Sequence, residues 1–161
     1  MVNVLKLSTS PRVCVALASL LLAACDRAPD CQFAGEGDQA VTAGCLVLHE
    51  EQLLLIEARG NKWSPPGGSV RPGESAQCGA ERETWEETNV AVVARDLAMT
   101  FENGFHLYWC DPVGVPEPEV ISPLEVMDVG FFGVESFAER RWRYPYQGNL
   151  YYRMVNERLG R

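Results

Sequence analysis

The sequence predicts an α+β domain in which a mixed β-sheet is covered by helices on both faces. Two observations favour this class. From residue 39 onward, short apolar segments bounded by polar, Gly or Pro residues have the character of strands. One central and one C-terminal segment have helical character instead. With 161 residues, the chain has room for one domain with a single core, which we place at residues 39–158.

The composition is that of a folded protein, with 47% hydrophobic and 22% charged residues. It excludes low-complexity, collagen-like and wholly disordered classes. The formal charge of −8 argues against nucleic acid as a partner, because neutralising phosphates requires a basic surface. The excess of acids has two interpretations: a well-solvated surface, or carboxylates gathered around a cation.

Residues 39–75 are expected to form a hairpin followed by an irregular loop. Two apolar stretches within residues 39–59 are joined by the polar segment 49–52, which is typical of two antiparallel strands. The next segment, residues 61–75, is rich in Pro and Gly, so we expect no regular structure there.

Residues 76–88 are predicted to form a helix, with Ser75 as its N-cap and Asn89 as a left-handed stop. Four further strands and a proline-spaced loop are expected after it. A closing amphipathic helix follows, because apolar residues recur there at helical spacing. The strands are placed at 90–93, 97–101, 104–110 and 126–134, the loop at 111–123 and the last helix at 147–159.

The first 24 residues have the features of a secretory signal. They contain no acid, and two basic residues precede a mainly apolar run over 13–24. That run is too short to cross about 30 Å of hydrocarbon. It ends in Leu-Ala-Ala-Cys, which resembles the lipobox of bacterial lipoproteins. The resemblance implies cleavage of residues 1–24 and lipidation of Cys25, which would anchor the protein to a membrane of the bacterial cell envelope, on the periplasmic or extracytoplasmic face. Residues 25–38, polar and rich in Gly and acids, would then be a tether.

Four cysteines remain after the predicted cleavage. An even number in an oxidising compartment suggests up to two disulfides, with three possible connectivities that the sequence does not rank. Four buried thiols are the alternative. A zinc site is disfavoured because no C-x-x-C spacing occurs. The cysteines are Cys31, Cys45, Cys78 and Cys110.

The central predicted helix carries three glutamates whose spacing places them on one face. Glu83, Glu86 and Glu87 stand at i, i+3 and i+4, where like charges repel one another. A divalent cation would compensate this repulsion, since Mg²⁺ prefers hard oxygen ligands. Glu74 can add a ligand from just before the helix, and Arg82 can hold a neighbouring carboxylate in place. The alternative is a solvated acidic face.

The loop and helix together resemble the Nudix box, G-x5-E-x7-R-E-U-x-E-E-x-G-U, where U is a bulky apolar residue. Two positions depart from this pattern: Thr84 replaces an apolar residue, and Asn89 replaces the last glycine. Neither changes a carboxylate. The matching residues are Gly68, Glu74, Arg82, Glu83, Glu86, Glu87 and Val90.

The resemblance to the Nudix family implies an α/β/α sandwich that uses Mg²⁺ or Mn²⁺ to hydrolyse small-molecule diphosphates, such as nucleoside diphosphate derivatives. Carried over by position, Glu83, Glu86 and Glu87 become the metal ligands. Glu74 becomes a supporting acid, and Arg82 orients a glutamate. A non-catalytic Nudix-fold lipoprotein that binds a ligand or protein is the alternative function.

Substrate contacts are expected from the entry loop and from residues that could stack or pair. The candidates are Gly67 and Gly68 for close backbone approach, Trp63 for stacking, and Arg59 and Arg71 for phosphates. Other aromatic candidates are Phe101, Phe105, Tyr108 and Trp109. A general base could come from Glu117, Glu119 or Glu125, with solvated surface acids as the alternative. The one basic cluster, with Arg140, Arg141 and Arg143, could approach an anionic substrate or lipid headgroups, and an ordinary exposed turn is the alternative. The particular substrate and the oligomeric state are not predictable from these features.

Overall fold

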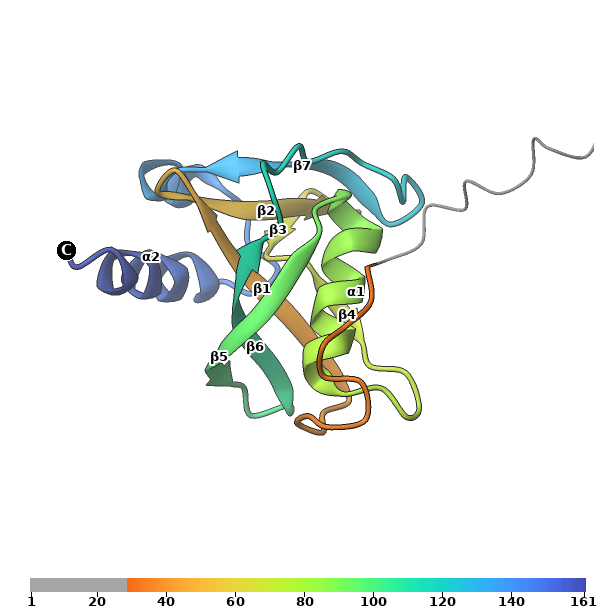
Figure 1. Ribbon diagram of the computed structural model, residues 1–161. Helices are drawn as coiled ribbons and strands as arrows, with labels where there is room; N and C mark the ends of the chain where they lie inside the picture. The colour runs from red at the N-terminus through yellow and green to blue at the C-terminus, as the bar shows by residue number, and fades with distance from the viewer. Residues whose placement is uncertain (1–28) are drawn as a thin grey trace, which may run out of the picture.

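The computed structural model describes residues 29–161, so the predicted leader and Cys25 lie outside the described residues. Within this part of the chain, seven strands form one sheet (Figure 1). The strands are β1 (Thr42–His49), β2 (Gln52–Ala58), β3 (Lys62–Ser64), β4 (Gly67–Ser69), β5 (Val92–Thr100), β6 (Phe105–Pro112) and β7 (Val126–Phe132). The helices are α1 (Ala76–Thr88) and α2 (Gln147–Arg158), with a 3-10 helix η1 (Val134–Glu139) before α2.

The sheet is mixed, as predicted. Its main path runs β3-β2-β1-β6-β5, with β4 also paired to β1 and β7 to β2. Only β1 and β6 run parallel among these pairs, and their register begins with Thr42 opposite Phe105. The parallel pairing of β1 with β6 places these two strands at the centre of the sheet, where β1 also contacts β2 and β4.

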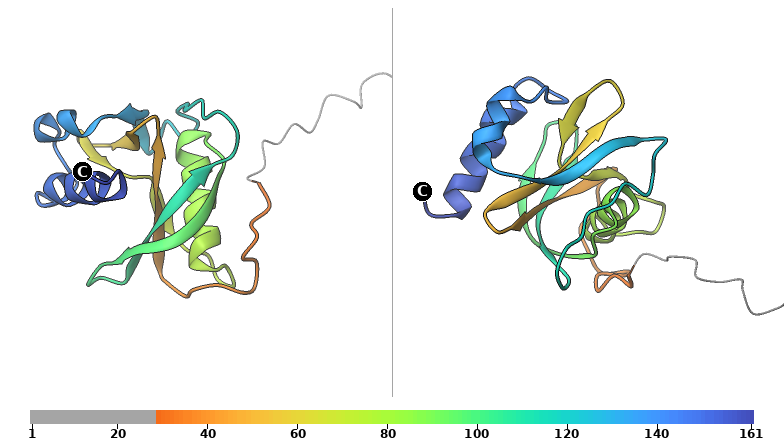
Figure 2. Two further views of the ribbon diagram at one scale, coloured as in Figure 1. Left: turned by 60° about the vertical axis from the view of Figure 1, so that its left-hand side comes forward. Right: turned by 90° about the horizontal axis from the view of Figure 1, so that it is seen from above.

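Helices α1 and α2 lie on opposite sides of the strands, which confirms the α/β/α arrangement (Figure 2). Alternate residues of β1 supply the two cores, because successive side chains of a strand point to opposite faces. Cys45 and Val47 belong to the cluster that includes Ala80 of α1. Leu46 belongs to the cluster that includes Val155 of α2. Neither helix in the described part of the chain combines the length and apolar character needed to cross a membrane.

The predicted hairpin is formed by β1 and β2. Glu50 and Glu51 lie between them with φ values of 48° and 64°. Two consecutive left-handed residues are typical of the turn whose twist matches that of the flanking strands. On its other part, β1 pairs with β4, which belongs to the loop that enters α1.

The caps of α1 are those predicted from the sequence. The Ser75 hydroxyl accepts a hydrogen bond from the Cys78 N–H at 3.2 Å. Asn89 adopts φ 60° and donates its N–H to the Trp85 carbonyl. Thr84, which departs from the box pattern, is fully buried and donates its hydroxyl to the Ala80 carbonyl at 2.7 Å. Its hydroxyl is therefore satisfied within the helix, so the departure leaves no buried polar group unpaired.

Three local predictions were wrong. The loop 61–75 contains the short strands β3 and β4, which pair with β2 and β1. The strands expected at 90–93 and 97–101 form the single strand β5, whose register shifts twice against β6. The segment predicted as strand to residue 134 ends at Phe132 and continues as η1.

The four cysteines form two disulfides in the connectivity Cys31–Cys78 and Cys45–Cys110. The first joins the N-terminal segment to the first turn of α1, and the second joins the neighbouring strands β1 and β6. The sequence left this pairing open because partners 47 and 65 residues apart are brought together only by the fold.

Residues 31–38, predicted as part of a tether, are fastened to the domain instead. Besides the Cys31 disulfide, Phe33 packs against the core beneath α1. The Asp38 carbonyl accepts from the Ala76 N–H at 2.8 Å, and its carboxylate accepts from the Tyr108 hydroxyl at 2.8 Å. These contacts move the start of the folded unit from residue 39 to about residue 31.

Candidate active site

A cavity of about 1250 Å³ opens beside the N-terminal half of β1 and the loop that enters α1. Glu83 and Glu87 of α1 line it, together with Gly67 and Gly68 of β4. Its other walls come from the β5–β6 hairpin and from the segment that leads into α2. The structure therefore brings three regions distant in sequence to one hollow, with two of the predicted glutamates on its surface.

Arg82 organises the acids around this cavity. Its Nε and Nη2 donate to the two carboxylate oxygens of Glu74, both at 2.9 Å. Its Nη1 donates to Glu83 at 2.8 Å and to Glu86 at 2.9 Å, and Nη2 also donates to the Ser69 carbonyl at 2.8 Å. All five N–H donors of the guanidinium are thus committed. Arg82 is a fixed structural centre that holds three carboxylates.

Glu74 and Glu86 are further held by Arg71, on the outer side of this network. The Arg71 N–H donates to Glu74 at 2.8 Å, and its guanidinium donates to Glu86 at 2.9 Å. Partial burial favours the neutral form of Glu74, but the hydrogen bonds from Arg82 and Arg71 outweigh it, so its pKa falls below the ordinary value. Glu74 is therefore an ionised supporting acid, in keeping with the role that the box implies.

Glu87 is the most buried of the box glutamates, with 8% of its surface exposed. Its Oε2 accepts a hydrogen bond from the Gly67 N–H at 2.8 Å. Desolvation, with a smaller contribution from the nearby charge of Glu83, raises its pKa to about 8 against the effect of this hydrogen bond. A carboxylate so placed gains from a cation beside it.

Gly68 allows the carboxylate of Glu83 to lie against the backbone of β4. A Cβ at residue 68 would stand 2.5 Å from the Glu83 carboxyl carbon. At Gly67, a Cβ would stand 2.6 Å from the Ala43 carbonyl oxygen of β1. Both glycines are needed for close approach, one to the acid and one to the neighbouring strand.

The residues at this site fit a divalent cation of the Mg²⁺ type. Two carboxylates, Glu83 and Glu87, line the cavity, and Mg²⁺ commonly takes one or two carboxylates while keeping waters and substrate phosphates. Within residues 29–161, no three acidic, His or Cys side chains stand ready to hold a metal ion together. Glu86, the third predicted ligand, is engaged by Arg71 and Arg82 instead of lining the cavity.

Of the five residues predicted first as substrate contacts, three line the cavity and two do not. Gly67, Gly68 and Arg59 line the cavity. Arg71 does not line it, because its guanidinium is paired with Glu86. Of the other aromatic candidates, Phe101 and Phe105 line the cavity, whereas Tyr108 and Trp109 do not.

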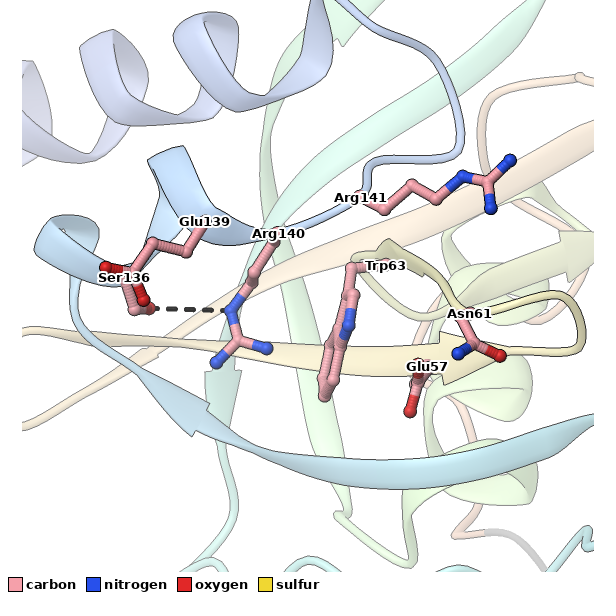
Figure 3. A pocket seen from close by; sticks show the side chains of 7 residues that line it. All are labelled: Glu57, Asn61, Trp63, Ser136, Glu139, Arg140 and Arg141. Carbon is pink, nitrogen blue, oxygen red and sulfur yellow. Dashed lines mark hydrogen bonds between the residues drawn. The ribbon is translucent and has the colours of Figure 1, made fainter.

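Trp63 lies in a second, smaller pocket of about 360 Å³, whose lining includes none of the box glutamates (Figure 3). The Arg140 guanidinium stands over its ring, with the guanidinium carbon 4.1 Å from the ring centroid, and 3.7 Å from that of Phe132. These stacked groups join η1 to β3 and β7. Trp63 is therefore absent from the lining of the cavity that contains Glu83 and Glu87.

The basic cluster and the start of α2 contribute further residues to the cavity lining. They are Arg143, Tyr144, Tyr146 and Gln147. The sequence offered this cluster as a possible contact to an anionic substrate, but no local pattern indicated which of its arginines lies at the cavity. Among the three loop glutamates considered as a base, Glu125 lines the cavity and Glu117 and Glu119 do not.

Comparison with known proteins agrees with this fold. A sequence profile described as the NUDIX domain matches residues 38–153. The α/β/α sandwich with an arginine-held set of glutamates on its central helix defines the class of protein. The chain belongs to the Nudix family.

Two curated relatives match only part of this chain. The chain is 36% identical over 62 residues to a MutT-like protein of Streptomyces ambofaciens, a match that covers 38% of this chain and 40% of that protein. A second match, to a Bacillus subtilis (strain 168) protein, is 46% identical over 54 residues and covers 31% of this chain and 36% of that protein. The chain therefore spans about two fifths of the length of these relatives.

Solved structures show the same fold over most of the described domain. The MutT protein from Methanosarcina mazei Go1 has a TM-score of 0.58 and 25% identity, covering 76% of this chain and 97% of that one. An ADP-ribose pyrophosphatase from Streptococcus suis 89-1591 has a TM-score of 0.62 and 18% identity, covering 74% and 91% respectively.

Proposed function

We propose that this protein is a divalent-metal-dependent hydrolase of a diphosphate linkage in a nucleoside diphosphate derivative or a related small molecule. The observation that carries the proposal is the position of Glu83 and Glu87 on the wall of a large cavity, beside a set of acids held by Arg82. Family membership agrees with it.

Each box residue has a distinct part in the proposed reaction. Glu83 and Glu87 would hold Mg²⁺ or Mn²⁺, and Glu86 would join them on release from Arg71. The bound cation would neutralise charge on the diphosphate oxygens and lower the pKa of the attacking water. Arg82 and Glu74 keep the glutamates in fixed rotamers, so that little reorganisation is needed when substrate enters.

We assign the role of general base to Glu125. It lines the same cavity as Glu87, and its charge contributes to raising the pKa of Glu87. Its carboxylate could therefore accept a proton from a water near the metal-binding glutamates. The Glu125→Gln variant should lower kcat strongly, whereas Glu117→Gln, outside the cavity, should leave it unchanged.

A substrate screen on the purified protein tests the proposal. ADP-ribose, dinucleotides, nucleotide sugars and prenyl diphosphates would be offered with and without Mg²⁺, and product formation measured. We expect turnover that requires the metal and is lost in Glu87→Gln. Glu81→Gln is the matched control, because Glu81 lies on the same helix and its carboxylate only accepts from the Ala94 N–H, which a Gln side-chain oxygen can still do. Ligand binding by calorimetry with no product from any compound would favour the non-catalytic alternative instead.

We also propose that the protein is exported and anchored through a lipid on Cys25. The proposal rests on the N-terminal motif, which lies outside the described residues, and two disulfides are consistent with an oxidising compartment. Labelling of cells with a palmitate analogue should mark the full-length protein and fail to mark Cys25→Ala. An unlabelled wild-type protein would remove the anchoring proposal without affecting the enzymatic one.

A further inference from the structure

A diphosphate bound in this acidic cavity would need a positively charged side chain beside it. Two of the arginines around the site are already paired with carboxylates. Arg82 uses all five N–H donors of its guanidinium in hydrogen bonds to Glu74, Glu83, Glu86 and the Ser69 carbonyl. Arg71 is paired with Glu86 outside the cavity lining. Arg82 cannot hold a phosphate without breaking the network that positions the glutamates, and Arg71 is absent from the cavity lining.

Two arginines line the cavity in the described part of the chain, Arg59 and Arg143. Neither forms an ion pair with a carboxylate there within 4.0 Å. Arg143 lines the same cavity as Glu83 and Glu87, the proposed metal-binding residues. Without a carboxylate partner among the described residues, its guanidinium has donors to offer.

The backbone of Arg143 is held from one side by β3. The Trp63 N–H donates to the Arg141 carbonyl at 2.8 Å, and the Arg143 N–H donates to the Trp63 carbonyl at 2.9 Å. These bonds form a short parallel bridge in which Trp142 stands opposite Trp63. Trp63, which the sequence suggested as a stacking residue, therefore acts through its backbone to place Arg143.

The residue after Arg143 is held from the other side by Gln147. The buried Gln147 side chain accepts from the Tyr144 N–H at 2.9 Å and donates to the Tyr151 hydroxyl at 2.9 Å. Both ends of this amide are thus satisfied within the protein. The segment that carries Arg143 is fixed at its backbone, while the guanidinium remains exposed at the cavity.

We propose that Arg143 is a phosphate-binding residue, which holds the diphosphate group of the substrate from the segment before α2 while Glu83 and Glu87 approach it from α1. The inference rests on the proposed function, since it takes the cavity as a diphosphate site. A guanidinium presents paired donors that match two phosphate oxygens, and it reduces the repulsion between a polyanionic substrate and the acids of the site.

Binding of methylenediphosphonate, a diphosphate analogue with a carbon bridge that water does not cleave, tests the inference independently of turnover. Calorimetry would measure its Kd in the presence of Mg²⁺ for the wild-type protein and three variants. We expect Arg143→Gln to raise Kd by about tenfold or more, because it removes charged hydrogen bonds. Arg143→Lys should recover part of the loss by keeping the charge. Arg141→Gln is the matched control, since Arg141 is also exposed but lines the smaller pocket.

The outcomes separate this inference from the proposed function. A Kd for Arg143→Gln equal to that of Arg141→Gln, or a wild-type protein that does not bind the analogue, overturns the role of Arg143. Wild-type binding that Arg143→Gln loses, with no hydrolysis of any diphosphate compound, sustains that role while the proposed activity fails. Where turnover is found, the same change should raise KM more than it lowers kcat. Matching melting temperatures for the two Gln variants would show that a loss of binding is not a loss of folding.

Discussion

The carboxylate of Glu83 lies directly against the backbone of Gly68, so closely that a Cβ at residue 68 would stand 2.5 Å from its carboxyl carbon. This contact lets an acid of α1 meet the strand β4 with no side chain between them. The glycine at the start of the box is therefore a requirement of packing against the glutamate, in addition to any contact with substrate.

Gly68→Ala should displace Glu83 and lower the proposed diphosphatase activity by about tenfold or more, because small displacements of a positioned group are costly. The melting temperature should fall little, since Glu83 can rotate away. Ser69→Ala is the control, because it leaves the Ser69 carbonyl that accepts from Arg82 intact. Equal kcat/KM values for the two variants would contradict this account of Gly68.

Arg82→Lys should lower the free energy of unfolding by about 2 kcal/mol, because a lysine cannot replace the five-donor fork and leaves carboxylates unpaired. Urea unfolding measures the change. Arg95→Lys provides the comparison: the Arg95–Asp111 pair is well exposed on both sides, and exposed pairs contribute about 1 kcal/mol or less. Similar losses for both variants would mean that the Arg82 network is no stronger than a surface ion pair.

Loss of either disulfide should destabilise the protein by about 2–5 kcal/mol, because each closes a long segment of the unfolded chain. The paired changes Cys31→Ser with Cys78→Ser, and Cys45→Ser with Cys110→Ser, separate the two contributions in urea unfolding. The first pair should also release the segment 31–38, which would be seen as faster proteolysis ahead of Asp38. Unchanged proteolysis would mean that Phe33 and Asp38 hold the segment by themselves.

Asn89→Gly should raise the free energy of unfolding by about 0.5–1 kcal/mol, because Asn89 adopts φ 60° at the end of α1 and glycine carries no penalty there. Asn89→Val, with a β-branched side chain at the same position, should lower it. Thermal or urea unfolding of the three proteins gives the order directly. A valine variant as stable as the wild type would contradict the left-handed stop.

Prediction from the sequence succeeded where the cause is local. The polar turn between β1 and β2 and the caps of α1 at Ser75 and Asn89 depend on residues close in sequence. The spacing of the three glutamates placed them on one helix face for the same reason. Prediction failed for β3 and β4, because three-residue strands exist only through pairing with β2 and β1.

The sequence by itself determined the fold class, the box helix and the set of acids on it, since helix periodicity, capping and turn chemistry act over a few residues. Only the tertiary structure decided which disulfides form, that residues 31–38 belong to the domain, and that Glu86 is paired with arginines rather than lining the cavity. It also decided that Arg143 lines the cavity together with Glu83 and Glu87, whereas Trp63 and Arg71 do not. These outcomes depend on contacts between segments far apart in the chain, and such contacts follow from how the whole core packs, which no short pattern records.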